Sequence, residues 1–186
     1  MSTLKLGRWS KLSIDDTTQS LSFGPIEAMQ VPQGWLSGNE GQNPESAATE
    51  ITIHPAESPQ VSFTFFYRGF SISKESGKNF AALLANNAHD LNEEEKDEIQ
   101  QALDSLALKT AFAPEKFATR NLNGKMVLEI TGLWQANQDH YIGIMVDATG
   151  TGQELYEVFL SAPKAEFEKY LPEYKASLDS IVWSRD

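Results

Sequence analysis

Cysteine is absent from this chain of 186 residues. Its absence excludes disulfide bonds, thiolate metal sites and cysteine nucleophiles. Long apolar runs are absent as well, so no segment is predicted to cross a membrane as a helix. The opening sequence MSTLKLGRWSKL lacks the apolar segment and the small-residue cleavage site of a secretory signal. We therefore expect a cytoplasmic protein that does not insert into a membrane.

Positive charge is scarce. Lys and Arg together number 15 against 26 Asp and Glu, which gives a formal net charge of -11 at pH 7. Affinity for nucleic acid depends on counterions released around Lys and Arg, so no nucleic-acid partner is expected. With 40% hydrophobic and 22% charged residues, the composition is typical of a soluble globular protein. The length suits one domain with a substantial core.

Motifs that carry catalytic or metal chemistry are also missing. The three histidines, His54, His89 and His140, lie far apart and form no HExxH pair. The segment DATGTGQ at 147–153 contains a GxG, but a strand-like pattern follows it, which favours a hairpin turn over a phosphate-binding loop. No GxSxG nucleophile motif occurs. We predict no catalytic residue, no metal site and no cofactor, and hence a protein that is not an enzyme.

An acidic stretch near residue 92 has the spacing of a helix start. Asn92 followed by Glu95 is a capping-box pair, and it predicts a helix over 92–108. Asp90, Asn92 and Glu94 also alternate as the first ligands of a calcium-binding loop do. The sixth and twelfth positions of that loop do not hold the required Gly and Glu, so the calcium interpretation fails.

Hydrophobic periodicity predicts an α+β domain, with a single antiparallel sheet of about six strands covered by helices. The six strands are expected at 26–31, 48–54, 60–68, 125–134, 140–148 and 153–162, with a short further strand near 117–122. Helices are expected at 77–89, 92–108 and 163–179, and Pro172 should kink or break the last one near Leu171. The predicted core contains Phe63, Phe65, Phe80, Leu103, Phe167 and Leu171.

Two short segments predict sharp turns. In VPQGW, Pro32 should end a strand, Gly34 should permit a turn, and Trp35 should fold its ring over the core. Asn123-Gly124 predicts a type I′ hairpin, because both central residues of that turn need positive φ.

These elements, taken in order, resemble the PsbP-like family. The resemblance is carried by VPQGW, the paired strands, the NGK hairpin, the strands GLWQ and YEVFLSAP, and the C-terminal FEKYLPEYKASLDSIVW. The same group includes the bacterial DcrB-like proteins, the yeast Ran-release factor Mog and the Eag chaperones of type VI secretion effectors. The resemblance implies a PsbP-like α/β/α sandwich over residues 26–186. Residues 1–25 lie outside the resemblance and are expected to form an N-terminal β extension, within one compact domain overall.

The resemblance also implies a protein that works through its surface, as an adaptor, an accessory subunit or a chaperone, with another protein as its partner. Two other classes stay open. The chain could bind a small apolar ligand or lipid in a pocket between sheet and helices, or it could be an enzyme whose residues come from scattered positions. No functional residue of the family is carried over by a matching motif.

Mixed faces on two predicted strands provide candidate binding residues. Thr64, Phe66 and Arg68 alternate with apolar residues on one strand, and Glu129 and Thr131 do so on another. A merely solvated face is the ordinary explanation. The functional alternative is that part of this face is open, and that these five residues contact a partner protein. Aromatic and guanidinium groups such as those of Phe66 and Arg68 are typical of binding hot spots.

Overall fold

The computed structural model describes residues 20–37, 50–70, 74–104 and 112–185. These ranges contain three helices: α1 (Lys74–Leu84), α2 (Glu93–Asp104) and α3 (Lys164–Asp179). They also contain the strands β1 (Ser20–Phe23), β2 (Ile26–Gln30), β3 (Trp35–Ser37), β4 (Glu50–Pro55), β5 (Ser62–Phe70), β6 (Phe112–Leu122), β7 (Lys125–Trp134), β8 (His140–Asp147), β9 (Glu154–Ala162) and β10 (Val182–Trp183). The α+β class predicted from the sequence is confirmed.

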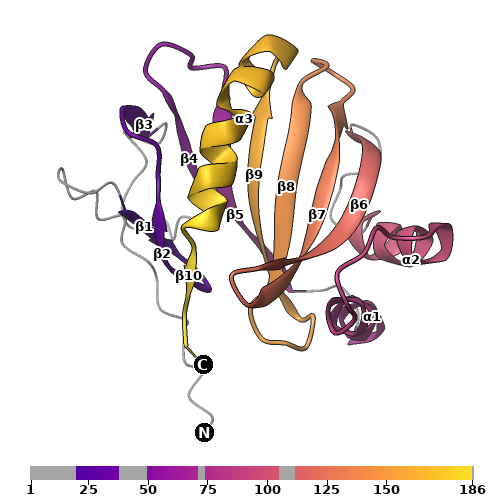
Figure 1. Cartoon of the computed structure of the whole chain (residues 1–186). Helices are drawn as coiled ribbons and strands as arrows, with labels where there is room; N and C mark the ends of the chain where they lie inside the picture. Colours follow the sequence, from indigo (N-terminus) through magenta and orange to yellow (C-terminus); the bar gives the residue numbers. More distant parts are fainter. Residues whose placement is uncertain (1–19, 38–49, 71–73, 105–111, 186) are drawn as a thin grey trace, which may run out of the picture.

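The strands form two antiparallel sheets where the sequence predicted one. The large sheet has seven strands in the order β3-β4-β5-β9-β8-β7-β6, and the small sheet has the order β1-β2-β10 (Figure 1). The strand predicted at 26–31 is β2, which pairs with β1 and β10 instead of joining the large sheet. Alternation identifies a strand but not its neighbours, which explains the error. Strand β1 lies in the predicted N-terminal extension, whose residues 1–19 fall outside the described part.

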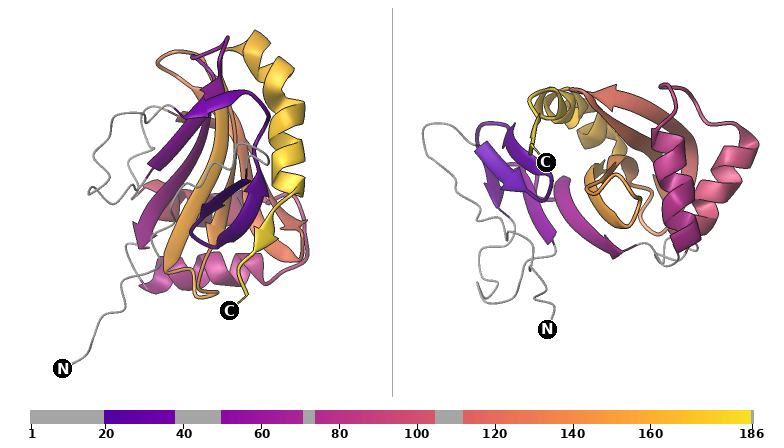
Figure 2. Two further views of the ribbon diagram at one scale, coloured as in Figure 1. Left: turned by 90° about the vertical axis from the view of Figure 1, so that its left-hand side faces the viewer. Right: turned by 90° about the horizontal axis from the view of Figure 1, so that it is seen from below.

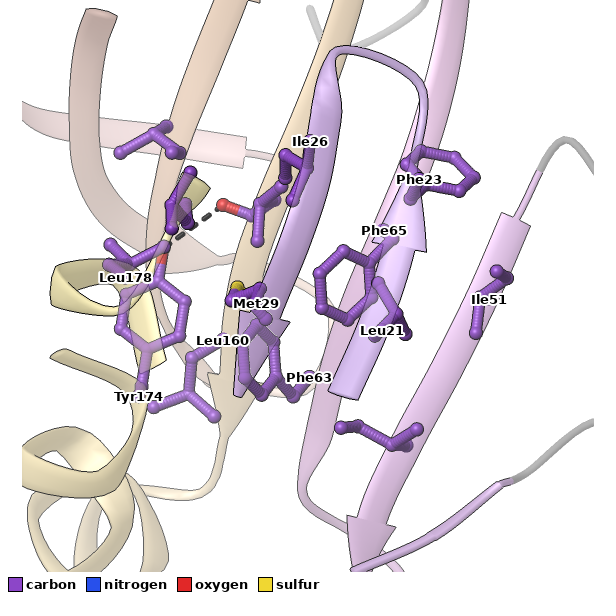
Figure 3. Close-up of a cluster of buried hydrophobic side chains, with 14 of the residues drawn as sticks. Leu21, Phe23, Ile26, Met29, Ile51, Phe63, Phe65, Leu160, Tyr174 and Leu178 are labelled. Carbon is purple, nitrogen blue, oxygen red and sulfur yellow. Dashed lines mark hydrogen bonds between the residues drawn. The ribbon is translucent and has the colours of Figure 1, made fainter. Parts of the chain in front are cut away.

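Helices and the small sheet cover the large sheet from two sides. Helix α3 and the small sheet lie on one face, while α1 and α2 lie on the other face near β6 (Figure 2). On the α3 side, Phe63 and Phe65 of β5 are completely buried and pack with Tyr174 of α3 and Met29 of β2 (Figure 3). The hydroxyl of Tyr174 donates to the backbone carbonyl of Val158, 3.0 Å away, which satisfies its polar group inside this core.

Three of the six predicted core residues are confirmed. Phe63, Phe65 and Phe80 are buried, whereas Phe167 and Leu171 are half-buried at the margin of the core beneath α3. The side chain of Leu103 lies outside the described part of the chain.

Pro172 was expected to kink or break the last helix near Leu171; α3 continues through it, so the helix does not break there. Pro172 is exposed, so the carbonyl that loses its intrahelical partner can be hydrated. On the opposite side of the helix, Tyr170, Tyr174 and Leu178 are buried. Packing of this face holds the helix together where propensity alone would end it.

The two predicted turns are confirmed. Asn123 and Gly124 have φ values of 51° and 88°, as a type I′ turn between β6 and β7 requires. At the VPQGW corner, Gly34 has a φ of 80°, and Trp35 is 5% exposed. The indole of Trp35 lies edge-on to Phe63, with ring centroids 6.0 Å apart, so it covers the core as expected.

Candidate functional site on a half-covered sheet face

Helices α1 and α2 cover one face of the large sheet only in part, and this face is the candidate site. Residues that lie directly opposite each other on neighbouring strands share a face. The register places Leu36 beside His54 and Thr52 beside Thr64, so the face extends over β3, β4 and β5. We define the polar half-face as the side chains that β4 and β5 contribute to it: Glu50, Thr52, His54, Ser62, Thr64 and Phe66.

The chemistry of this face changes across the sheet. Near β6, Leu128 and Met145 are buried in the core that includes Phe80 of α1. On β4 and β5 hydroxyl groups take the place of these aliphatic chains, and Thr52 Oγ1 lies 2.9 Å from Thr64 Oγ1. Thr52 is half-buried, whereas Thr64 is 2% exposed, so the hydroxyl of Thr64 is satisfied inside the protein rather than presented to solvent.

An ion pair lies where the two parts of the face meet. Arg68 Nε donates to Glu157 Oε2 at 2.6 Å, and the two side chains are 9% and 2% exposed. The register between β5 and β9 shifts between Tyr67 and Gly69, which identifies Arg68 as the extra residue of a β-bulge. At this position the guanidinium compensates the charge of a buried carboxylate.

Tyr141 completes this buried cluster. Its hydroxyl donates to Glu157 Oε1 from the neighbouring strand β8. Burial, together with the carboxylate of Glu157, raises the pKa of Tyr141 well above its usual range, so the hydroxyl keeps its proton and remains a donor. The ring lies across Gly143, where an added Cβ would meet Tyr141 Cζ at 2.7 Å and Phe159 Cβ at 2.9 Å. Only a glycine at this position leaves room for the tyrosine to reach Glu157.

The structure places the five predicted binding residues on two opposite faces. Thr64, Phe66 and Arg68 share the half-covered face, while Glu129 and Thr131 lie opposite Ile144 and Ile142 on the α3 side. The five therefore do not form one surface. Alternation assigns faces within a strand, but it does not relate the faces of two strands that are separated by β8 and β9.

Arg68 is engaged within the chain rather than presented to solvent. Besides pairing with Glu157, its guanidinium carbon lies 5.3 Å from the centroid of the Phe66 ring. This cation–π contact fixes the half-buried ring of Phe66 from the side of the sheet. Sequence reasoning missed Glu157 and Tyr141. The signal for Glu157 is a carboxylate in the interior of the strand ELYEVFLSA, whose other carboxylate, Glu154, stands at its first position.

The histidines do not assemble a catalytic or metal centre. His54 Nδ1 lies 3.0 Å from the carbonyl of Pro55, and the ring of His140 lies against Phe167. His89 contacts Glu95 and Thr119, but Thr119 is 2% exposed and offers no accessible nucleophile. Among the described residues, no three His, Asp or Glu side chains are grouped closely enough to hold a metal ion.

The glycine-rich segment at 147–153 is the predicted hairpin turn. The carboxylate of Asp147 accepts the backbone N–H groups of Thr149 at 3.0 Å, Gly150 at 3.1 Å and Gly152 at 2.6 Å. Backbone N–H groups in such a loop can bind a phosphate, but here the carboxylate of Asp147 already accepts their hydrogen bonds. The turn connects β8 and β9, as the sequence indicated.

Comparison with known proteins establishes the fold. No protein-family model matches the sequence, and a search of curated proteins finds no relative. The chain is similar to the solution structure of cyanobacterial PsbP (CyanoP) from Synechocystis, with 13% identity and a TM-score of 0.52, over 99% of this chain and 98% of that one. At this identity the similarity shows a PsbP-like fold and nothing further. In the described part, no helix is long and apolar enough to span a membrane.

Proposed function

We propose that this chain is a cytoplasmic, non-enzymatic protein-binding module, an adaptor, accessory subunit or chaperone, and that its polar half-face contacts the partner. One observation carries the proposal: helices cover one part of a sheet face and leave a half-buried aromatic ring among hydroxyl groups on the other. The PsbP-like fold supports it, as does the resemblance to the DcrB-like proteins, Mog and the Eag chaperones, which work through their surfaces.

The polar half-face has the composition of a protein interface. Phe66 is a rigid aromatic anchor, and aromatic side chains are enriched at the centres of such contacts. Thr52, which is half-buried on the neighbouring strand, offers a hydroxyl that both donates and accepts hydrogen bonds, whereas Thr64 is 2% exposed and is not available to a partner. The Arg68–Glu157 pair beneath Phe66 holds the anchor in place before a partner arrives. Such preorganisation lowers the entropy cost of binding.

Site-specific photo-crosslinking tests this surface. A benzophenone side chain placed at Thr52 should form adducts with a partner in cells of the source organism. The matched control is the same group at Lys175, which is exposed on α3. Adducts from position 52 that are absent from position 175 support the proposal. Adducts from position 175 alone contradict it.

An aromatic cluster favours a second candidate function, the binding of a small apolar ligand or lipid. The ring centroids of Phe112 and Phe159 lie 5.0 and 5.3 Å from that of Tyr141. The ring centroid of Trp134 lies 5.2 Å from that of Phe112. The rings of Phe112, Trp134 and Phe159 are only half-buried, at the edge of the core beneath α1 and α2. A fatty acid that binds here should change the fluorescence of the wild-type protein, and the change should be lost in Trp134→Phe. Identical titration curves for the two proteins would exclude this site.

A further inference from the structure

The tip of the β6–β7 hairpin holds the end of helix α3. Both N–H groups of the Asn123 side chain are engaged, because Nδ2 donates to the backbone carbonyl of Asp179 at 3.0 Å and to that of Ile181 at 2.9 Å. Residues 179–183, which we name the C-terminal segment, include β10, the third strand of the small sheet (Figure 1). Because β10 is only two residues long, its pairing with β2 fixes it weakly, and the contacts with the hairpin contribute to its position.

A second contact joins the same two parts of the chain. Trp183 Nε1 donates to the carbonyl of Leu122 at 2.8 Å, and Lys125 Nζ lies 5.7 Å from the centroid of the Trp183 ring. Leu122 and Lys125 flank the turn at Asn123 and Gly124. The hairpin tip therefore contacts the C-terminal segment on both sides of Asn123, so release of the segment breaks these contacts together.

Asn123-Gly124 is also the sequence at which a side-chain amide is most easily lost. In an Asn-Gly pair the backbone nitrogen of glycine can attack the side-chain Cγ, because glycine carries no side chain that hinders the approach. The N–Cγ bond forms as the Cγ–Nδ2 bond breaks, ammonia leaves, and a five-membered succinimide ring results. Water then opens this ring at either carbonyl and leaves aspartate or isoaspartate. The chain contains no other Asn-Gly pair.

The closed turn opposes this reaction. A type I′ turn has a ψ of about +30° at its first central residue, which directs the Gly124 nitrogen away from Cβ of Asn123, whereas ring closure needs both on the same side of the Cα–C bond. The N–H of Gly124 donates to Asn121 Oδ1 at 3.0 Å, and Nδ2 of Asn123 is held by two carbonyls. The turn must therefore open, and the C-terminal segment must release Asn123, before the ring can form.

We propose that Asn123 is a modification site guarded by the C-terminal segment, and that its deamidation keeps the segment released. The reaction removes the donor that binds Asp179 and Ile181 and puts a carboxylate oxygen in its place. An acceptor then faces two acceptors, so the contact cannot form again. Isoaspartate in addition lengthens the backbone of a two-residue turn by one carbon, which disturbs the register of β6 and β7. A transient release of the segment is thereby made permanent by a covalent change.

The rates of deamidation in the folded and the unfolded chain test the guard. The full-length protein is incubated at mildly alkaline pH, with and without a denaturing concentration of guanidinium chloride, and peptide mass spectrometry follows the amide of Asn123. The folded protein should lose this amide more than about tenfold more slowly than the unfolded chain, because only the open turn reacts. Equal rates in the two conditions would show that the turn is not guarded and would overturn the proposal.

Two variants connect the rate to the C-terminal segment. Trp183→Phe keeps an aromatic ring but removes the N–H that binds Leu122, so the folded variant should deamidate about two- to tenfold faster than the wild type. Val182→Thr is the matched control, because it keeps a β-branched side chain at a residue of the same strand that is 53% exposed, and it should deamidate at the wild-type rate. A wild-type rate in folded Trp183→Phe, or equal acceleration in both variants, would contradict the guard.

The modified protein tests the effect of deamidation on the segment. Deamidated protein carries one more negative charge, so anion exchange separates it from the unmodified form. The N–H groups of Ile181 and Ser184 are hydrogen-bonded in the folded protein. Their protection from hydrogen exchange should fall at least about fivefold, because two hydrogen bonds of the segment are lost, while amides of the β8–β9 ladder should not change. Asn123→Asp, which reproduces the aspartate product, should show the same loss. Unchanged protection of Ile181 and Ser184 in the deamidated protein would overturn the proposal.

Discussion

Arg68 and Glu157 form an ion pair within the large sheet, and the carboxylate of Glu157 is 2% exposed. Transfer of two charges out of water is costly, and an apolar pair of similar volume is often as stable. The location of the pair is more informative than its contribution to stability, because the guanidinium of Arg68 also lies over the ring of Phe66 in the polar half-face. We interpret the pair as a device that positions this surface.

Replacing one member of the pair should destabilise the fold. Arg68→Ala leaves Glu157 buried and uncompensated, so the free energy of unfolding should fall by about 3–5 kcal/mol. The double variant Arg68→Met with Glu157→Leu should lose less, about 1–3 kcal/mol, because no charge stays buried and only the hydroxyl of Tyr141 loses its acceptor. Urea unfolding of both proteins measures this. A loss of at most about 0.5 kcal/mol for Arg68→Ala, as for an ordinary surface substitution, would contradict the buried pair.

Gly143 should tolerate no side chain while Tyr141 lies across it. Gly143→Ala should cost about 1–3 kcal/mol in overpacking, because its Cβ would collide with the tyrosine ring. In a Tyr141→Leu background the same substitution should cost clearly less, since the ring is gone. Denaturant unfolding of the wild type, the two single variants and the double variant gives the coupling free energy between the two positions. Additive losses would show that the ring and the glycine do not interact.

Asn123 should be needed for its amide as well as for its turn geometry. Its Nδ2 donates to the carbonyls of Asp179 at 3.0 Å and Ile181 at 2.9 Å, and so ties the β6–β7 hairpin to the end of α3. Asn123→Asp suits the turn but directs a carboxylate at two carbonyl oxygens, so it should cost about 1–3 kcal/mol at pH 7. Asn123→Gly, which only removes the two bonds, should cost less. Equal stability of Asn123→Asp and the wild type would refute this role.

Local sequence signals predicted much of the fold. The strand expected at 125–134 is β7 at its full length, and the Asn123-Gly124 turn and the Asn92–Glu95 capping box have the expected geometry. Each of these signals depends on residues that are close together in the chain. Helix α1 ends at Leu84, earlier than the 77–89 expected, because periodicity indicates a helix better than it indicates its boundaries.

The candidate site depended on relations that no local pattern contains. Arg68 and Glu157 are 89 residues apart, and their contact depends on the pairing of β5 with β9 and on a bulge at Arg68. Glu129 seemed to belong with Phe66 because each lies on the mixed face of its strand, yet the register places them on opposite faces. The position of β2 in a separate sheet could not be predicted for the same reason, because alternation does not specify which strands pair.

The most direct test of the proposed surface is the affinity of Phe66→Ala for a partner identified by crosslinking. Val182→Ala is the matched control, because Val182 is 53% exposed on the small sheet, away from the polar half-face. We predict that Phe66→Ala raises the Kd more than about fivefold, or roughly 1 kcal/mol, while Val182→Ala leaves it unchanged and both proteins remain folded. An unchanged Kd for folded Phe66→Ala would contradict the assignment of the polar half-face as the binding surface.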